Sequence, residues 1–455
     1  MVNPVAIVIC NWNKRDDVIN CINSVIKSNF NKFEIYVVDN ASEDDSVEWI
    51  NKLYKDSVCL ILNSENKGGS GGFNAGIKIA IQNGHKYIHL LDNDVELDFD
   101  AIGSSYEYME EHDDIAAIGS KLYSYYQPGC LQEMGSDIDW NNYYIRPHYK
   151  GANDHGAIPE IIDCDYVPAC SVMIRVDAIV NTGLMDEGYF IYWDDIEFFY
   201  KMKSKGQRVI AYGKSKAWHK MGVSDRQTTF GTYYFWRNRI HFFVKYLTND
   251  QLNDFGQKIL KEAFQAVYFS AYKGQFKIAQ TIITSFRDSL QGIRGKAQEA
   301  RIHHRESYRN PLDLIINNYK AIEVIETSEC AFLHVLIKYI KSQSIDMMIT
   351  IRSFRHNIEE LKQQFPTVNI IPSDYPHCGK DVLLCQTTDH IVNIRNEIRE
   401  DIDFYVDSYF NVVSSQEDRI NLKNYDAVYQ AFINIWFPVL QLELKEFKKK
   451  LNLGG

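Results

Sequence analysis

The chain has 455 residues, enough for two or three domains that each bury a core of their own. Its composition, 45% hydrophobic and 24% charged, is that of a globular protein rather than a disordered or fibrous one. The net charge of −11 argues against a nucleic-acid-binding protein, because such proteins bind phosphates with an excess of lysine and arginine.

The charge is unevenly distributed along the chain. Residues 225–320 contain 15 lysines and arginines against 8 aspartates and glutamates, a net charge of +7, so the remainder carries −18. Two interpretations fit such a basic segment. It is either a surface for an anionic partner or membrane headgroups, or a solvated helical face.

The cysteines and the N-terminus bear on location. Nine cysteines occur without a Cys-x-x-Cys pair, a pattern that favours a reducing compartment. The N-terminus lacks the charged and apolar regions of a signal peptide, and no stretch approaches the roughly 20 apolar residues of a membrane span. We therefore expect a cytoplasmic protein whose contact with the inner face of a membrane, if it has one, is peripheral.

The first hundred residues alternate short apolar strands with single helices. Such an alternation is typical of a wound, parallel sheet. The pattern predicts strands at residues 5–10, 33–38, 58–62 and 87–91, and helices at residues 16–28, 44–54, 75–83 and 101–111.

Polar residues follow three of these strands. They are Asn11-Trp12-Asn13, Asp39-Asn40 and Asp92-Asn93-Asp94. Parallel strands end at one edge of a sheet, and ligands bind at that edge in α/β proteins. Two carboxylates one residue apart suit a hard cation such as Mg²⁺ or Mn²⁺ that bridges a diphosphate. The alternative is an Asp-rich turn that caps the next helix.

A glycine-rich segment follows the third strand. Residues 66–76, NKGGSGGFNAG, contain five glycines in eleven residues and are predicted to form a loop that ends in a helix. Free N–H groups at a helix N-terminus favour a phosphate. The pattern is neither a Walker loop nor a dinucleotide-binding fingerprint.

A second group of carboxylates lies among aromatic residues. Asp194, Asp195 and Glu197 occur within residues 188–200, GYFIYWDDIEFFY. Such surroundings shift the pKa values of carboxyl groups or favour their pairing. Alternatively, Asp194 is only the N-cap of a helix at residues 195–205. A strand at residues 208–212 then leads to Trp218-His219, and a lone histidine before a lysine is usually a surface residue.

The middle of the chain is aromatic and basic. Residues 123–159 show little periodicity and are predicted to be an irregular excursion, followed by a strand at residues 166–174. Residues 233–246 interleave aromatic rings with Arg237, Arg239 and Lys245. We expect an amphipathic helix there that packs on the preceding domain and meets lipid headgroups.

The composition changes near residues 310–311, where a second strand–helix alternation begins. It predicts strands at residues 321–326, 345–351, 368–371 and 382–385, helices at residues 331–341 and 358–365, and a helical tail at residues 425–451. This part has neither a glycine-rich loop nor paired carboxylates after a strand. Its role as scaffold, oligomerisation module or partner-binding domain stays open.

Taken jointly, four motifs resemble those of a known enzyme family. The motifs are VAIVICNWNK, EIYVVDNASEDDS, NKGGSGGFNAG and LLDNDVELD, in this order and spacing. They resemble inverting family 2 glycosyltransferases of the GT-A fold, and within them the rhamnosyl- and galactofuranosyltransferases of bacterial polysaccharide synthesis. The resemblance extends over residues 5–245. It implies an α/β fold with a Rossmann-like, mostly parallel wound sheet at residues 1–225. The residue pattern itself predicts a helical basic extension at 226–315 that packs on this domain and a smaller α/β domain at 316–455, to which the resemblance does not extend.

The resemblance also implies roles for individual residues. Asp195 would be the catalytic base, Asp94 and His219 would hold Mn²⁺ or Mg²⁺, and Trp193 and Asp194 would lie on the acceptor side. Residues expected to bind the nucleotide sugar are Trp12, Asn13, Asp39, Gly68, Gly69, Gly71, Gly72, Asn74, Asp92 and Asn93. Within this set Trp12 would stack on the base, Asp39 would accept from the base, and Asp92 would contact the ribose or the metal shell.

The implied reaction moves a sugar from a UDP or dTDP donor to a glycan or lipid-linked acceptor. Two alternatives remain: a sugar-phosphate nucleotidyltransferase, and a non-catalytic carbohydrate- or assembly-binding protein on a transferase fold. In nucleotidyltransferases the glycine loop usually follows the first strand, whereas here it follows the third.

Overall fold

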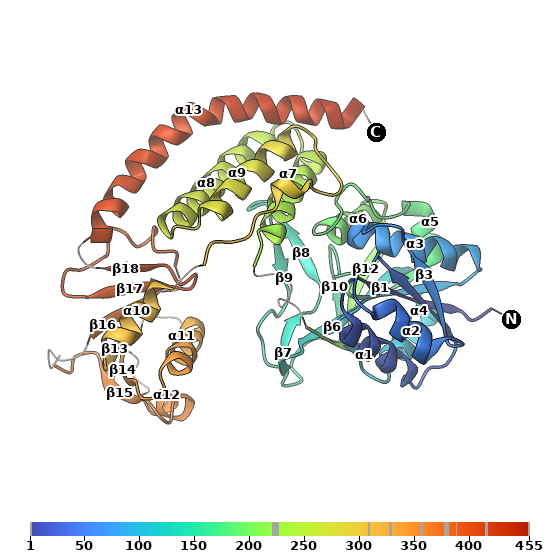
Figure 1. The fold of residues 1–455 in the computed structure, drawn as a ribbon, viewed down its shortest axis with the longest axis horizontal. Helices are drawn as coiled ribbons and strands as arrows, with labels where there is room; N and C mark the ends of the chain where they lie inside the picture. The colour runs from blue at the N-terminus through green and yellow to red at the C-terminus, as the bar shows by residue number, and fades with distance from the viewer. Residues whose placement is uncertain are drawn as a thin grey trace. The chain divides into compact units, whose positions relative to one another are not determined.

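The computed structural model describes residues 2–453 apart from residues 221–226, 308–309, 327–329, 355–357, 377–381, 388 and 415–416. The chain forms two compact units (Figure 1). The larger unit comprises Met1–Ile259, Lys277–Arg305 and Gln441–Gly455, and the smaller unit comprises Leu260–Phe276 and Glu306–Leu440. The boundary expected between residues 225 and 226 lies outside the described residues, and the three-domain division stays a prediction.

One sheet organises the larger unit. Within the described residues its order is β10-β12-β6-β11-β4-β1-β2-β3, with β5 beside β12 and β7 beside β6. The neighbours β3, β2, β1 and β4 run parallel, and β11 is antiparallel between β4 and β6. The strands are β1 (Val5–Asn11), β2 (Phe33–Asp39), β3 (Val58–Leu62), β4 (Tyr87–Asp92), β5 (Val95–Leu97), β6 (Ile115–Ser124), β7 (Gln127–Glu133), β10 (Ile161–Asp163), β11 (Ser171–Arg175) and β12 (Arg208–His219).

Helices cover this sheet, and Figure 1 shows the first four gathered around β1 to β4. Alternate residues of β1 face opposite sides, so that Val5, Ile7 and Ile9 share one core with Val18 and Ile22 of α1. Each such buried side chain contributes roughly 1.5–3 kcal/mol. The helices of residues 1–290 are α1 (Arg15–Ile26), α2 (Ser46–Tyr54), α3 (Gly68–Gln82), α4 (Ala101–Glu111), α5 (Val176–Thr182), α6 (Asp194–Ser204), α7 (Phe230–Tyr246), α8 (Gln251–Tyr272) and α9 (Phe276–Leu290), and α8 continues from the larger unit into the smaller one.

The glycine-rich segment differs from its prediction. Helix α3 begins at Gly68 rather than near residue 75, so most of the expected loop is helical. The glycines serve close packing, because a Cβ on Gly72 would lie 2.3 Å from Cys10 Sγ and one on Gly76 would lie 2.3 Å from Val8 Cγ1. The absence of side chains therefore lets α3 lie directly on β1 and brings its N-terminus to the carboxyl edge of the sheet.

Three further segments differ from expectation. Residues 123–159, expected to be irregular, form β7 and the hairpin of β8 (Ser136–Asp139) and β9 (Tyr144–Pro147). The strand expected at residues 166–174 is confined to β11, because Pro168 starts a turn in which Ser171 N donates to its carbonyl. Strand β12 continues past residue 212 to His219 through an irregularity between Tyr212 and Lys216.

Helix α7 is buried around most of its surface. The expectation that Arg237 and Arg239 face lipid headgroups is wrong, because these side chains are only 1% and 2% exposed. Their guanidinium groups donate to backbone carbonyls within the larger unit instead. The aromatic residues that gave the segment its amphipathic look pack on both sides of the helix.

The smaller unit contains a second α/β sheet, as the sequence predicts. Its strand order is β15-β14-β13-β16-β17-β18, and all neighbours are parallel except β17 and β18. Two short strands were not expected, β17 and β18. The elements are β13 (Ala321–Ile325), β14 (Met348–Ser353), β15 (Asn369–Pro372), β16 (Val382–Thr387), β17 (Phe404–Asp407), β18 (Val412–Ser414), α10 (Pro311–Asn318), α11 (Cys330–Gln343), α12 (Ile358–Gln364) and α13 (Glu417–Leu453), the last continuing into the larger unit.

The structure confirms the predicted α/β class with helical segments and a second α/β domain. Among the described residues no helix is both long and apolar enough to cross a bilayer. The cysteines described as free are Cys10, Cys21, Cys59, Cys130, Cys164, Cys170 and Cys385.

The contact between α3 and β1 can be tested by adding one methyl group. Gly76→Ala improves helix propensity but forces a Cβ against Val8, so we expect a net loss of about 1–3 kcal/mol in the free energy of unfolding. Urea unfolding followed by circular dichroism measures it. Gly129→Ala is the matched control, because a Cβ there meets nothing within 4 Å. Equal stability of the two variants would contradict the packing argument.

Candidate active site

The ends of β1, β2 and β4 meet at the carboxyl edge of the sheet. The parallel register places Asn11 opposite Asp39 and Cys10 opposite Asp92. Asp39 is buried, and its carboxylate accepts from Asn11 Nδ2 at 3.1 Å, from Ser42 Oγ at 2.6 Å and from Ser42 N at 2.9 Å. This carboxylate therefore closes the turn after β2, whatever else it binds.

The short strand β5 brings Asp94 and His219 together. It pairs with the end of β12, so that His219 lies opposite Val95 and Lys220 N donates to Asp94 O at 3.1 Å. His219 Nε2 lies 3.2 Å from Asp94 Oδ1. The other ring nitrogen, Nδ1, is 3.1 Å from Gln132 Oε1. A histidine held through one nitrogen presents the other to a carboxylate or a metal ion.

Lys14 completes the surroundings of Asp94. Its Nζ donates to Asp94 Oδ2 at 2.8 Å, so the two carboxylate oxygens face a lysine and a histidine. Desolvation raises the pKa of Asp94, but the contacts with His219 and Lys14 outweigh it and hold this pKa well below its usual range. Asp94 is therefore ionised at neutral pH.

The neighbouring Asp92 behaves in the opposite way. Desolvation, and then the charge of Asp94, raise the pKa of Asp92 to about 6. Desolvation lowers the pKa of His219, but the hydrogen bond and charge of Asp94 outweigh it, so this pKa is raised. Two carboxyl groups with pKa values pushed apart at the end of one strand are typical of a functional site.

The donor atoms at this edge fit a divalent cation. Asp92, Cys170 and His219 each offer a ligand atom, and the three atoms lie within 4.8 Å of one another. Asp94 adds a carboxylate oxygen beside His219. Carboxylate oxygens suit Mn²⁺ and Mg²⁺, the His219 imidazole is a softer ligand than a carboxylate, and the Cys170 thiol is softer still. Cys170 was missed because it lies in an apolar run that reads as strand interior.

Asp194 and Asp195 are the first two residues of helix α6. Asp195 Oδ2 accepts from Ala169 N at 3.4 Å, and Cys170 O accepts from Asp92 N at 3.1 Å, so residues 169 and 170 join the two acidic positions. Desolvation raises the pKa of Asp195, and the charge of Asp195 in turn contributes to the raised pKa of Asp92. Desolvation and the adjacent Asp195 raise the pKa of Asp194.

The N-terminus of α3 meets the same acidic group. A Cβ on Gly69 would lie 3.3 Å from Asp194 Oδ2, and one on Gly68 would lie 2.0 Å from Phe190 O. Gly68 has a φ of +73°, a conformation that glycine adopts without strain. Gly71 packs over Lys67 in the same way. Because they lack side chains, these glycines let the N-terminus of α3 lie close to residues 190–194 and to the carboxyl edge of the sheet.

Several predicted site residues serve the fold in this structure. Asn74 is buried and bonds to both backbone groups of Met185, Nδ2 to O at 2.9 Å and N to Oδ1 at 3.1 Å. Trp193 is buried against Phe242 and Phe243 of α7, and its predicted place on the acceptor side stays a prediction. Asn93 donates to Asn11 Oδ1 at 2.8 Å.

The residues of the first turn differ in exposure. Asn13 has a φ of 50° and accepts from Glu43 N at 2.7 Å, which ties the turns after β1 and β2 together. Trp12 is 48% exposed, an unusual position for so large an indole and one that leaves its face open to a planar ligand.

Sequence reasoning missed four polar neighbours of the acidic group. Besides Lys14, Gln132 and Cys170, Glu133 at the end of β7 is buried, and its carboxyl group accepts from Ser136 Oγ at 2.6 Å. Desolvation raises the pKa of Glu133 to about 7 against the effect of Ser136, and the charge of Asp195 adds to the rise. Gln132 and Glu133 belong to the segment expected to be irregular, which offered no signal.

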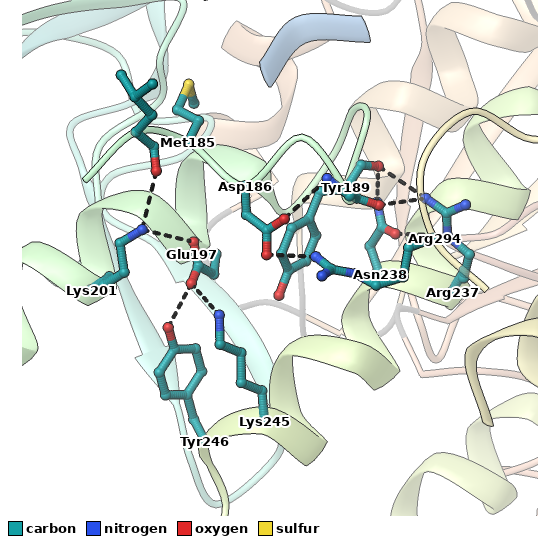
Figure 2. Close-up of polar contacts among 12 residues, drawn as sticks. Met185, Asp186, Tyr189, Glu197, Lys201, Arg237, Asn238, Lys245, Tyr246 and Arg294 are labelled. Atoms are coloured by element: carbon teal, nitrogen blue, oxygen red, sulfur yellow. Dashed lines mark hydrogen bonds and ion pairs between the residues drawn. The ribbon is translucent and has the colours of Figure 1, made fainter. Parts of the chain in front are cut away.

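A network of polar contacts supports the loop before Asp194 (Figure 2). Asp186 forms an ion pair with Arg294 at 2.5 Å, and the fully buried Glu197 accepts from Lys245 Nζ and Tyr246 Oη, each at 2.7 Å. Phe190, Tyr192 and Trp193 have φ values of 69°, 60° and 67°. A non-glycine residue in this left-handed region costs roughly 1–2 kcal/mol, so the surrounding contacts must stabilise the loop.

Comparisons with known proteins find similarity to glycosyltransferases. Residues 6–159 match the family model described as "Glycosyl transferase family 2", a segment that includes Asp39, Asp92 and Asp94 and ends before Asp195. The chain is 24% identical over 203 residues, 44% of its length and 71% of the relative's, to the Escherichia coli protein named UDP-Glc:alpha-D-GlcNAc-diphosphoundecaprenol beta-1,3-glucosyltransferase WfaP.

A second relative and a solved structure show lower sequence identity. The Haloferax volcanii low-salt glycan biosynthesis hexosyltransferase Agl10 is 22% identical over 251 residues, 52% of this chain and 75% of that protein. A crystal structure of GalNAc-T7 with UDP, GalNAc and Mn²⁺ aligns with a TM-score of 0.42 and 15% identity over 52% of this chain and 47% of that one. This chain thus spans about half of that structure's length, and the fold assignment rests on the strand order above.

The place of Lys14 beside Asp94 leads to a prediction about metal affinity. Lys14→Gln removes a cation that competes for Asp94 Oδ2, so Mn²⁺ affinity should rise on the order of tenfold at low salt. Titration of Mn²⁺ followed by its electron paramagnetic resonance signal measures free ion directly. Lys86→Gln is the control, because Lys86 pairs with Glu110 at the start of β4, away from the site. Unchanged or weaker binding in Lys14→Gln would show that Asp94 does not hold the ion.

Proposed function

We propose that the larger unit is a family 2 glycosyltransferase that moves a sugar from a nucleoside-diphosphate donor to an acceptor hydroxyl, with inversion at the anomeric carbon. The observation that carries the proposal is the convergence of Asp92, Asp94 and His219 at one sheet edge, with Asp195 near enough to raise the pKa of Asp92. The family match of residues 6–159 and the names of the relatives support it.

The proposed chemistry is a single displacement. The acceptor oxygen bonds to the anomeric carbon while the bond from that carbon to the donor phosphate breaks, and the electron pair leaves with the diphosphate. Asp195 Oδ1 or Oδ2 takes the proton of the acceptor hydroxyl. One carboxylate suffices because a diphosphate needs little protonation to leave, unlike the leaving group in hydrolysis by a pair of carboxylates.

Other residues of the edge would bind the donor. Asp94 and His219 would hold Mn²⁺ or Mg²⁺, with Asp92 beside them, and the ion would supply positive charge opposite the diphosphate. The N-terminus of α3 offers backbone N–H groups to the same phosphates. Trp12 would stack on the base. Lys14 adds a second positive charge at this place.

The donor and acceptor are proposed by class. The name of the Escherichia coli relative joins a UDP-linked hexose with a lipid-diphosphate-linked sugar. We propose a UDP- or dTDP-linked hexose, with galactofuranose and rhamnose in the tested set, and a glycan or lipid-linked acceptor.

A panel of donors tests this proposal. The full chain is incubated with Mn²⁺, each donor in turn and an acceptor sugar, and the release of nucleoside diphosphate is measured. Release of pyrophosphate from a sugar phosphate and a nucleoside triphosphate would instead identify a nucleotidyltransferase, and donor binding without turnover a binding protein.

The role of Asp195 predicts a separation between binding and turnover. Asp195→Asn keeps the shape of the side chain and removes the proton acceptor, so kcat should fall about 10²–10⁴-fold while donor affinity is retained. Steady-state kinetics together with calorimetric titration of UDP in the presence of Mn²⁺ separate the two. A parallel loss of affinity and turnover would count against a role as base.

The raised pKa of Asp195 predicts the pH dependence of the same step. The base must be deprotonated, so kcat should fall as the pH is lowered through this pKa, and the acid limb should lie above the ordinary aspartate pKa of about 3.9. A kcat–pH profile from pH 4 upward in a constant-ionic-strength buffer measures it. A flat profile down to the ordinary aspartate pKa would exclude Asp195 as the base.

A further inference from the structure

Two adjacent residues of α7 donate hydrogen bonds to the loop that precedes Asp194 and Asp195. Arg237 and Asn238 are 1% and 2% exposed, and both side chains point toward Tyr189 (Figure 2), within the loop of residues 188–192 that they contact. The loop comes from a different part of the sequence and ends at Trp193, whose carbonyl accepts the first helical hydrogen bond, from Glu197 N at 3.0 Å. Asp194 and Asp195 follow directly.

Asn238 contacts three carbonyls of this loop with one amide group. Its Nδ2 lies 2.9 Å from Tyr189 O, 2.8 Å from Ile191 O and 2.8 Å from Tyr192 O. An amide nitrogen has two hydrogens, so they are shared among three acceptors that converge on one point. The left-handed residues of the loop turn these carbonyls toward the amide. Removal of the amide takes one donor from each of them, although Tyr189 O keeps the hydrogen bonds from Arg237 Nη2 and Ile191 N.

Arg237 fixes the orientation of that amide. Its Nε donates to Asn238 Oδ1 at 2.9 Å, which requires Asn238 Nδ2 to face the loop. Its Nη2 donates to Tyr189 O at 3.0 Å and its Nη1 to Gly295 O at 2.8 Å. Within the described part of the chain this guanidinium has no carboxylate partner, and burial lowers its pKa.

Burial of an arginine bound to carbonyls and aromatic faces costs desolvation free energy. Apolar side chains of similar size would stabilise the helix as well without that cost. The Arg237 guanidinium lies 4.8 Å from the ring centre of Tyr234, which stacks on Phe190 of the same loop. Among the described residues, Arg237 and Asn238 form hydrogen bonds and cation–π contacts within their own helix turn, with residues 188–192 and with Gly295. The contacts favour a task specific to this loop.

We propose that Asn238, oriented by Arg237, is a positioning residue that holds the 188–193 loop in its left-handed form and so sets where Asp195 lies at the sheet edge. The inference rests on the proposed function for the part that concerns turnover. The structural part of the proposal, that the Asn238 amide holds the 188–193 loop, does not depend on any reaction. The two parts are therefore measured separately.

The test compares two buried polar residues of the same helix in the full chain. Asn238→Leu keeps the number and branching of the side-chain heavy atoms and removes the donors to the loop. Arg239→Met is the matched control, because Arg239 is equally buried but its Nε donates to Tyr143 O at 2.9 Å, away from the loop. Thermal unfolding, calorimetric UDP–Mn²⁺ affinity, kcat and its acid limb, and amide hydrogen exchange of residues 188–196 are measured for each.

For Asn238→Leu we expect faster exchange in residues 188–196, a kcat lowered about 10- to 100-fold with a shifted acid limb, and UDP–Mn²⁺ affinity within about twofold of wild type. Arg239→Met should lower the unfolding temperature without these local effects. Equal changes of exchange and kcat in the two variants would reduce Asn238 to a general stabilising residue and overturn the proposal.

Two further comparisons decide the proposal if Asn238→Leu does not fold or if the wild-type protein shows no activity. If Asn238→Leu does not fold, Asn238→Ser retains one hydroxyl donor and should show a smaller loss of kcat and a smaller rise in exchange, whereas wild-type behaviour on both measures would overturn the proposal. If the wild-type protein releases no nucleoside diphosphate with any donor, the proposed function fails, while the exchange of residues 188–196 still decides whether the amide holds the loop.

Discussion

The candidate metal site depends on the pairing of one three-residue strand, β5. By joining the end of β12, β5 sets the Asp94 carboxylate 3.2 Å from His219, a residue from a distant part of the chain. Neither residue alone distinguishes a metal site from a capped turn. The parallel register of β1, β2 and β4 then brings Asn11, Asp39 and Asp92 to the same edge. Backbone pairing, more than side-chain attraction, therefore assembles the site.

The electrostatics of the edge follow from this assembly. Several carboxyl groups gather there, and two nearby bases, His219 and Lys14, direct their positive charge at one of them, Asp94. Desolvation raises the pKa values of both Asp92 and Asp195, and the charge of Asp94 raises that of Asp92 further. Such a cluster gains stability from a bound cation, and a divalent ion would release the protons that desolvation favours.

The sequence predicted the elements better than their contacts. Strands β1 to β4 and the acidic ends were readable because apolar runs of fixed length stop at polar residues. Close packing was not readable, since the glycines of α3 look like a loop until a neighbour such as Val8 is known. The extension of β12 to His219 was hidden by an irregularity after Tyr212, and the burial of Arg237 by a pattern that suits a surface helix equally. Each miss concerns a partner distant in sequence, which local patterns do not encode.

The most direct measurement of the central claim is the position of the cation itself. Crystals of the full chain grown with UDP and Mn²⁺ would locate the ion by its anomalous scattering. The account predicts a peak at coordination distance from Asp94 and His219, with the diphosphate beside the N-terminus of α3. A peak elsewhere, or nucleotide bound away from the carboxyl ends of β1 and β4 with the Lys14–Asp94 ion pair intact, would contradict it.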